Sequence, residues 1–291
     1  MGQLFSPGKL LLTSEYTVLD GALALAVPTK WGQEFFFDTH HNAPSELVWE
    51  AYHQGELWLY AKINYQTWEI LDSNLEQPAT FLVKVLQAVQ QLSSKVFQAD
   101  ESYFLKTNLQ FPADYGLGSS STLMNNLADW AEIDAYELNE LSLGGSGYDI
   151  AVAKEKSALL YQITGQQRLV RTIHFSPSFK DDLIFIHLNQ KQDSRKGIQH
   201  YRSKQKSQQL IDEFSELTKA VIKVQHLENF SQLMTLHEEK LSDFLGIQTV
   251  KEKYFENCPV FVKSLGAWGG DFVMSAKFPG FKDYFSGKGF E

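Results

Sequence analysis

The sequence predicts an α+β protein of two domains, and three observations support this prediction. The first half of the chain mixes strand-like and helix-like segments, whereas the last third combines long helical segments with a short β-hairpin. Between the two patterns lies a Pro-Ser-Phe-Lys segment at residues 177–180, which is typical of a connection. We therefore expect an N-terminal domain over residues 1–178 and a C-terminal domain over residues 179–291.

Each predicted element of the N-terminal part has its own pattern. Residues 47–63 predict a β-hairpin, because apolar and aromatic residues flank a turn that contains a glycine. Residues 78–96 predict a helix with a proline near its start and apolar residues on one face. Residues 102–111 alternate and are rich in aromatic residues, as in a strand, whereas residues 119–133 return to helical spacing.

The same criteria give the elements of the rest of the chain. Strands are predicted at residues 157–164, 168–175, 182–188, 259–265 and 271–277. The last two of these strands would form a hairpin around a glycine-rich loop. Helices are predicted as one long segment at residues 194–227 and as a second helix at residues 230–245.

The composition excludes several classes of protein. The chain has 291 residues, 43% of them hydrophobic and 21% charged, which is ample material for a globular core. Its net charge of −9 argues against nucleic acid as a partner. Cys258 is the only cysteine, so no internal disulfide is possible. No signal peptide is visible and no apolar run approaches the roughly 18 residues of a membrane span, so we expect a cytoplasmic protein without membrane contact.

The most informative segment joins the strand at residues 102–111 to the helix at residues 119–133. Its sequence is Pro-Ala-Asp-Tyr-Gly-Leu-Gly-Ser-Ser-Ser, and no Gly-Lys-Ser/Thr closes it as in a Walker loop. The glycines let backbone amides approach a ligand, the serines can cap the helix, and the helix N-terminus favours an anion. A plain Gly-Ser turn with a helix cap stays an alternative to a phosphate site. The predicted phosphate-binding residues are Gly116, Leu117, Gly118, Ser119, Ser120 and Ser121.

Further motifs stand on either side of this segment. Residues 6–16 contain Ser-Pro-Gly-Lys and Ser-Glu-Tyr, residues 147–151 are Gly-Tyr-Asp-Ile-Ala, and residues 263–271 are Lys-Ser-Leu-Gly-Ala-Trp-Gly-Gly-Asp. In this order, and over nearly the whole chain, these motifs resemble those of the GHMP kinase superfamily. The first and last motifs are similar to those of the mevalonate and phosphomevalonate kinase branch. Residues 147–151 resemble the GYDIA-type subfamily of bacteria.

The resemblance implies a fold and an activity. The implied fold has an N-terminal domain with a left-handed β-α-β unit and a C-terminal ferredoxin-like domain, with the active site in the cleft between them. The implied activity is phosphoryl transfer from ATP, with Mg²⁺, to the hydroxyl or phosphate of a small molecule. Mevalonate and phosphomevalonate are the leading acceptors.

The resemblance also implies roles for individual residues. Asp149 would be the catalytic base, Lys9 would lower its pKa and neutralise phosphoryl charge, and Ser120 would bind Mg²⁺. Without the resemblance, Asp149 would be a helix N-cap and Lys9 a solvated strand residue. A buried structural role is an alternative for Glu15. The residues expected near the acceptor are Glu15, Tyr16, Gly147, Gly266, Ala267, Gly269 and Gly270.

The chain departs from the family pattern at several positions. Ser14 replaces a glycine, and Trp268 stands where the family usually has glycine. We expect the Trp268 indole to cover a neighbouring ligand, because its flanking residues are too small to bury it in a strand core. The stretch before Asp149 is too short for the helix that carries the family's magnesium-binding glutamate. Glu137 or Glu140 could stand in for that residue, although both are also ordinary glutamates of a helix surface.

Three functions remain in competition at this stage. The first is a small-molecule kinase. The second is a nucleotide-binding regulatory protein with a degenerate active site, which Trp268 favours and which the intact Lys9, Ser120 and Asp149 oppose. The third is a decarboxylase that acts on a diphosphorylated acid, although the Gly-Tyr-Asp context fits the kinases better. The sequence leaves open whether the chain forms a homodimer.

Overall fold

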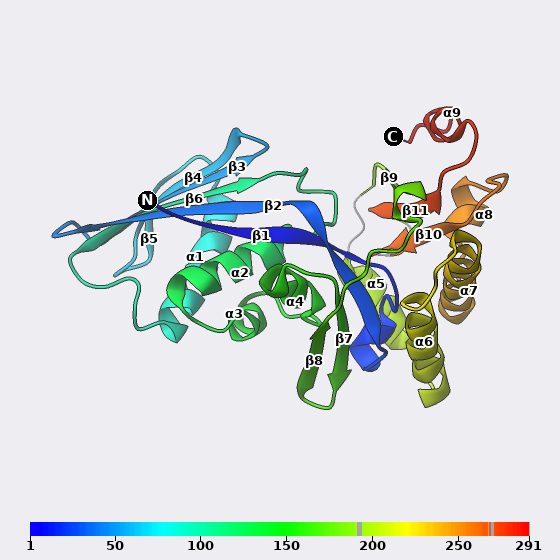
Figure 1. The fold of residues 1–291 in the computed structure, drawn as a ribbon. Helices are drawn as coiled ribbons and strands as arrows, with labels where there is room; N and C mark the ends of the chain where they lie inside the picture. The colour runs from blue at the N-terminus through cyan, green and yellow to red at the C-terminus, as the bar shows by residue number, and fades with distance from the viewer. Residues whose placement is uncertain (191–193, 267, 269–270, 291) are drawn as a thin grey trace. The chain divides into compact units, whose positions relative to one another are not determined.

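The computed structural model describes residues 1–190, 194–266, 268 and 271–290, and at residues 194 and 195 only the backbone (Figure 1). Contacts divide the chain into two compact units. The first unit comprises Met1–Lys9, Pro28–Ala113 and Leu117–Lys156, and the second comprises Leu10–Val27, Asp114–Gly116 and Ser157–Glu291. This division does not test the predicted boundary between residues 178 and 179, which stays a prediction.

A mostly antiparallel sheet forms one layer of the first unit. Its strands are β1 (Gly2–Leu11), β2 (Ala24–His41), β3 (Glu46–His53), β4 (Glu56–Asn64), β5 (Glu69–Ser73) and β6 (Glu101–Leu109). They are ordered β5-β4-β3-β6-β2, with β1 paired to β2. Only the β3–β6 pair among these described strands is parallel, and it aligns Trp49 with Leu105. The last residues of β1 and the first of β2 belong to the second unit.

Helices form the other layer of the first unit (Figure 1). They are α1 (Glu76–Leu92), α2 (Ser119–Ala131), α3 (Ala135–Ser142) and α4 (Tyr148–Glu155). Their apolar faces share one core with the sheet, in which Leu86, Leu127 and Ile150 pack with Phe35 and Trp49. Burial of such side chains contributes roughly 1.5–3 kcal/mol each, so this core fixes where α2 and α4 begin relative to β1.

The second unit contains a hairpin and a small antiparallel sheet. The hairpin strands are β7 (Leu159–Thr164) and β8 (Gln167–Thr172), and β7 also pairs with the start of β2. The small sheet has the order β10-β11-β9, formed by β10 (Val262–Leu265), β11 (Phe272–Ala276) and β9 (Leu183–His187). Both of its faces are covered, because Met274 packs into one core and its neighbour Val273 into another.

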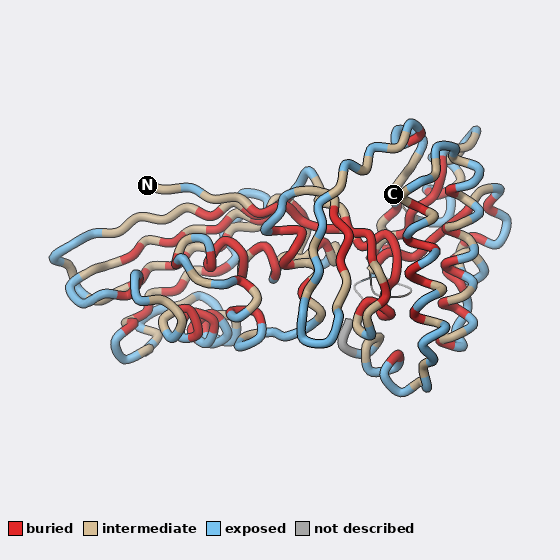
Figure 2. Tube along the Cα trace, turned by 60° about the horizontal axis from the view of Figure 1, so that its bottom comes forward, coloured by how far each residue is buried: buried red, intermediate tan, exposed pale blue. Residues whose placement is uncertain are grey.

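Five helices and two short 3₁₀ turns complete the described part of the second unit. The helices are α5 (Ser194–Ser203), α6 (Gln208–Val221), α7 (Leu227–Leu245), α8 (Val250–Tyr254) and α9 (Phe281–Ser286). The 3₁₀ turns are η1 (Thr17–Asp20) and η2 (Lys180–Asp182). Buried residues follow the strands and one side of each long helix (Figure 2).

The structure confirms the α+β class and most predicted elements, with two corrections. The stretch before Asp149, which was expected to be too short for a further helix, holds the helix α3, which carries Glu137 and Glu140. The helix predicted over residues 194–227 is two helices, α5 and α6. The break comes before Ser207, whose side chain accepts the N–H of Leu210 and caps α6. Helical spacing continues on both sides of the break, so the periodicity alone did not reveal it. Among the described residues, no helix combines the length and the apolar character that a membrane span needs.

Candidate active site

In the first unit, the backbone holds Lys9 against the glycine loop. Lys9 lies in β1, is buried, and donates its backbone N–H to the carbonyl oxygen of Leu117 at 2.9 Å. Gly8 permits this approach, because a Cβ there would lie 2.9 Å from the same oxygen and 2.6 Å from the Thr29 hydroxyl. The strand of the first motif and the loop of the second are therefore adjacent within one unit.

Gly118 turns the chain into α2. Its φ is 88° and its ψ 42°, in the left-handed region that glycine adopts at little cost. A Cβ there would lie 2.7 Å from Ser121 Oγ and 3.2 Å from Lys9 Cγ, so the stem of the lysine packs on the glycine. Ser121 Oγ donates to the Gly118 carbonyl and Thr122 Oγ1 to the Ser119 carbonyl, each at 2.8 Å, so neither hydroxyl acts as an N-cap. A helix start of this kind favours an anion.

Helix α4 begins on the other side of Lys9. It follows Gly147, which has a φ of 83°, and its first turn carries Asp149. Asp149 is half-buried, and its Oδ1 accepts the N–H of Ile150 at 3.1 Å. Lys9 Nζ lies 5.5 Å from the ring centroid of Tyr148, within the range of a cation–π contact. Lys9 therefore contacts the residues that begin α2 and α4.

The described residues of the first unit offer a carboxylate and a hydroxyl, which are oxygen donors of the kinds that a magnesium ion takes. Mg²⁺ keeps several waters and often takes only one or two protein carboxylates. Asp149 and the exposed hydroxyl of Ser120 are donors of this kind, and Glu137 and Glu140 lie exposed on α3. Within the described ranges, no group of three or more His, Cys, Asp or Glu side chains could hold a metal ion. Phosphate and water oxygens would therefore have to complete the coordination.

The second unit buries a group of charged side chains, of which the sequence analysis named only Glu15. Lys263 Nζ donates to Glu15 Oε1 at 2.5 Å, and both side chains are buried. His237 Nε2 lies 3.5 Å from the other oxygen of Glu15, but it accepts the N–H of Ser14 at 2.7 Å. Burial, reinforced by Lys263, holds the pKa of His237 well below its usual value. The imidazole is therefore neutral, and Glu15 and Lys263 form the ion pair.

Glu238 adds a second carboxylate to this group. It follows His237 on α7 and accepts the Ser264 hydroxyl at 2.9 Å and the Ser264 N–H at 3.1 Å. Burial raises the pKa of Glu238 to about 7, although Lys263 opposes this rise. Burial also raises the pKa of Glu15, and the ion pair with Lys263 opposes it. Burial therefore favours the protonated form of Glu238 more than it would be favoured in an exposed carboxyl.

Tyr16 connects the first motif to the third within the second unit. Its hydroxyl accepts the N–H of Trp268 at 2.9 Å, and its ring stacks on Tyr201 with centroids 5.8 Å apart. A Cβ on Gly197 of α5 would lie 2.3 Å from that hydroxyl oxygen, so the helix needs glycine there. The Trp268 indole is half-buried and donates to the Gln248 carbonyl at 3.2 Å. Its predicted covering of a ligand stays a prediction.

Asp271 lies between two glycines of the second unit. A Cβ on Gly116 would lie 2.2 Å from Asp271 Oδ2, and one on Gly266 would lie 3.4 Å from the same oxygen. Both glycines have positive φ angles, 67° and 75°, and Asp271 is buried. A carboxylate therefore lies against Gly116, the first glycine of the predicted phosphate loop.

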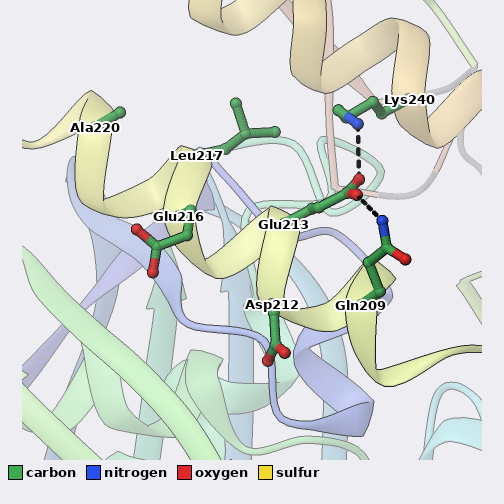
Figure 3. Close-up of a pocket in the computed structure, with 7 residues that line it drawn as sticks. All are labelled: Gln209, Asp212, Glu213, Glu216, Leu217, Ala220 and Lys240. Carbon is green, nitrogen blue, oxygen red and sulfur yellow. Dashed lines mark hydrogen bonds and ion pairs between the residues drawn. The ribbon is translucent and has the colours of Figure 1, made fainter.

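An open hollow of about 650 Å³ on α6 and α7 is not a candidate for this site (Figure 3). Glu213 lies at its centre, paired with Lys240 at 2.7 Å and accepting from Gln209 at 2.9 Å. None of its residues belongs to a predicted motif. The lining residues are Gln209, Asp212, Glu213, Glu216, Leu217, Ala220 and Lys240.

The predicted site residues divide between the two units. The first unit brings together Lys9, Gly147, Asp149 and the loop from Leu117 to Ser121. The second unit holds Glu15, Tyr16, Gly116 and Gly266, and the predictions at Ala267, Gly269 and Gly270 lie outside the described residues.

The missed charged residues left a signal in the sequence. Lys263 interrupts an apolar run that becomes the buried strand β10. On α7, His237 and Glu238 share the helical face of Met234 and Leu241, where a core residue is expected. Polar residues at core positions of two elements are the pattern that indicates a buried polar group.

Comparison with known proteins shows the fold of the GHMP kinases. Neither the protein-family models nor the curated proteins give a match to this sequence. Among solved structures, Leishmania major mevalonate kinase with R-mevalonate is 16% identical, with a TM-score of 0.72 over 99% of this chain and 91% of that one. Streptococcus pneumoniae phosphomevalonate kinase with phosphomevalonate and AMPPNP is 15% identical, with a TM-score of 0.72 over 100% and 98%.

The same fold is also found in an enzyme that is not named as a kinase. Staphylococcus aureus mevalonate diphosphate decarboxylase is 13% identical, with a TM-score of 0.60 over 98% of this chain and 90% of that one. These likenesses confirm the predicted two-domain fold. Sequence identities of 13–16% show a shared fold and nothing finer. Membership of the GYDIA-type subfamily therefore stays a prediction.

Proposed function

We propose that this protein transfers a phosphoryl group from ATP to the hydroxyl or phosphate of a small molecule. One observation supports this most: buried Lys9 contacts Gly118 at the start of α2 and Tyr148 at the start of α4. A cation, a helix start that favours an anion and the carboxylate of Asp149 therefore belong to one compact unit. Phosphoryl transfer requires this combination of positioning, charge neutralisation and a base.

The proposed roles follow from the chemistry of these groups. The first amides of α2 and the ammonium of Lys9 bind phosphate oxygens. Asp149 accepts the proton of the acceptor hydroxyl. The oxygen of that hydroxyl bonds to the γ-phosphorus of ATP while the bond between this phosphorus and the ADP oxygen breaks. Mg²⁺ would supply further charge neutralisation, and Ser120 and Asp149 are the donors that would hold it.

Mevalonate and phosphomevalonate are the first acceptors to test. The solved structures of the Leishmania and Streptococcus kinases contain these two molecules. Decarboxylation of a diphosphorylated acid is an alternative, because a mevalonate diphosphate decarboxylase has the same fold. A nucleotide-binding regulatory protein with a degenerate active site is the other alternative.

A coupled assay of ADP release tests the proposal directly. The purified chain is incubated with ATP and Mg²⁺ and with mevalonate, phosphomevalonate, homoserine or a hexose, and carbon dioxide release from diphosphomevalonate is measured in parallel. We expect ADP release that depends on one of these acceptors. ATP binding without transfer to any acceptor would favour the regulatory protein, and carbon dioxide release would favour the decarboxylase.

A further inference from the structure

Strand β9 ends the small sheet of the second unit, whose order is β10-β11-β9 (Figure 1). At one end of β9, Leu188 donates its backbone N–H to the Asp271 carbonyl at 2.8 Å. At the other end, the Asp182 carbonyl accepts the N–H of Lys277 at the same distance. In an antiparallel pair, the residues of a strand bond to the neighbouring strand at every second position. The even-numbered residues of β9 therefore bond to β11.

The odd-numbered residues of β9 leave main-chain groups at the edge of the sheet. The N–H and C=O groups of Leu183, Phe185 and His187 point away from β11. Within the part of the chain that the structure describes, these groups have no hydrogen-bond partner. The strand cannot turn to bury them, because Ile184 and Ile186 anchor it in an apolar core. An unpaired edge of this kind is a template for another strand.

Three other strands at the ends of the described sheets are protected against such pairing. Charged residues protect β5, which carries Glu69 and Asp72, and β8, which carries Arg168 and Arg171. Strand β10 is buried along its whole length. By contrast, β9 reads Leu-Ile-Phe-Ile-His, with no acidic residue, lysine, arginine or proline, and the side chain of Phe185 is 43% exposed.

The edge of β9 is complementary to itself. In an antiparallel pair with a two-fold axis at Phe185, this residue faces Phe185 of a second copy, and Leu183 of each copy faces His187 of the other. These are the residues whose main-chain groups are unpaired, so each facing pair exchanges two hydrogen bonds. The exposed phenyl rings of the two copies then lie side by side on one face of the joined sheet, where such pairs stabilise it.

The charges beside β9 also suit this pairing. The exposed Asp181 and Asp182 precede the strand, whereas residues 187–190 at its other end contain no carboxylate. In the antiparallel pair, the acidic end of each copy therefore faces the uncharged end of the other. A parallel pair would instead bring the carboxylates of the two copies together, where they repel each other.

We propose that β9 is the docking edge for a second copy of this chain, whose own β9 pairs with it antiparallel across a two-fold axis at Phe185. The small sheet then continues through both copies. A strand of five residues buries less surface than a standard interface, so the dimer dissociates with a Kd of roughly 1–100 µM. This inference does not depend on the proposed function.

Opposite charges at residue 185 provide the main test, by sedimentation velocity between about 1 µM and 1 mM. Phe185→Lys and Phe185→Glu each place like charges opposite one another, so each variant alone should weaken the dimer at least tenfold. An equimolar mixture of the two variants pairs lysine with glutamate, so it should regain the dimer. Phe81→Lys is the matched control, because Phe81 is 42% exposed on α1 of the first unit. It should dimerise as the wild type does.

Hydrogen exchange gives a second readout that uses the unmodified protein. The amides of Leu183, Phe185 and His187 should exchange about tenfold more slowly at 1 mM than at 1 µM, whereas those of Ile184 and Ile186 should be protected at both concentrations. This measurement also keeps the test valid if a variant at residue 185 fails to fold.

Several results would overturn the inference. A wild type that stays monomeric at 1 mM would leave the edge to a strand of some other protein. Dimers of Phe185→Lys as tight as those of the wild type would place the contact on another surface. A mixture of the two variants that stays monomeric would rule out the two-fold pairing at Phe185. Amides of the odd-numbered residues that are protected equally at both concentrations would mean that the chain covers its own edge.

Discussion

Gly118 combines two constraints at a single residue. Its φ of 88° strains any other residue, and a Cβ would also crowd Ser121 and Lys9. Gly165 in the β7–β8 turn is a matched control, because it has a φ of 61° but a Cβ there would meet no atom within 4 Å. Gly165→Ala should lose roughly 1 kcal/mol of stability. Gly118→Ala should lose more than this, because its Cβ also crowds Ser121 and Lys9. Only Gly118→Ala should also lose ATP affinity, by about tenfold or more, in calorimetric titrations. Equal ATP affinities in the two folded variants would contradict the assignment of the loop.

Asp271 has an electrostatic effect that a single substitution can isolate. Its carboxylate lies against Gly116, so it should repel an anion at the start of the phosphate loop. Asp271→Asn should therefore tighten the binding of metal-free pyrophosphate by roughly tenfold. Asp182→Asn removes an exposed charge from the same unit and should leave this affinity unchanged. If both variants bind pyrophosphate as the wild type does, Asp271 does not act on the loop.

At the scale of elements, the sequence predicted best where local chemistry determines the structure. The glycine turn and the start of α2 at Ser119 follow from local φ requirements, and the hairpins follow from alternation and turn residues. The prediction of one helix over residues 194–227 was wrong, because both α5 and α6 keep helical spacing. The short helix α3 was not predicted as a separate element, although Glu137 and Glu140 were expected on a helix surface.

We expect the stability of the protein to depend on pH through Glu238 on α7. Its pKa of about 7 in the folded state exceeds the usual 4.5, so the folded state holds more protons between these values. The stabilising contribution of Glu238 to the free energy of unfolding is therefore fully present below pH 4.5 and is lost as the pH rises through 7. Full loss is on the order of 3 kcal/mol.

The contribution of Glu238 to the free energy of unfolding is isolated by denaturant titrations of the wild type and of Glu238→Gln. The titrations cover roughly pH 5 to 8, the window set by this pKa. Glu15 and His237 face the same group, and the subtraction removes the pH dependence that they have in common in the two proteins. His237 has the opposite sign, because its lowered pKa costs stability as the pH falls below 6.5. The wild type should lose stability relative to Glu238→Gln as the pH rises. A constant difference would mean that Glu238 stays ionised throughout.

At the scale of the whole molecule, the motifs predicted the fold, but only part of the site. Glycine positions and hydrophobic spacing suffice for a fold that solved structures share at 13–16% identity. The pairing of Glu15 with Lys263 could not be predicted, because the two residues are 248 positions apart and meet only through tertiary packing. Tyr148 was missed as a contact of Lys9 for the same reason.

The most direct test of the account compares the wild type with Asp149→Asn in transfer of the labelled γ-phosphoryl group of ATP to the acceptor found in the ADP-release assay. Asparagine keeps the size of the side chain but can neither accept the proton nor carry the charge. The account predicts that kcat falls by about 100-fold or more, the scale of a general base, while ATP affinity stays within a few-fold of the wild type. Turnover by Asp149→Asn at the wild-type rate, or a wild type that binds ATP and transfers its phosphoryl group to none of the acceptors, would contradict the account.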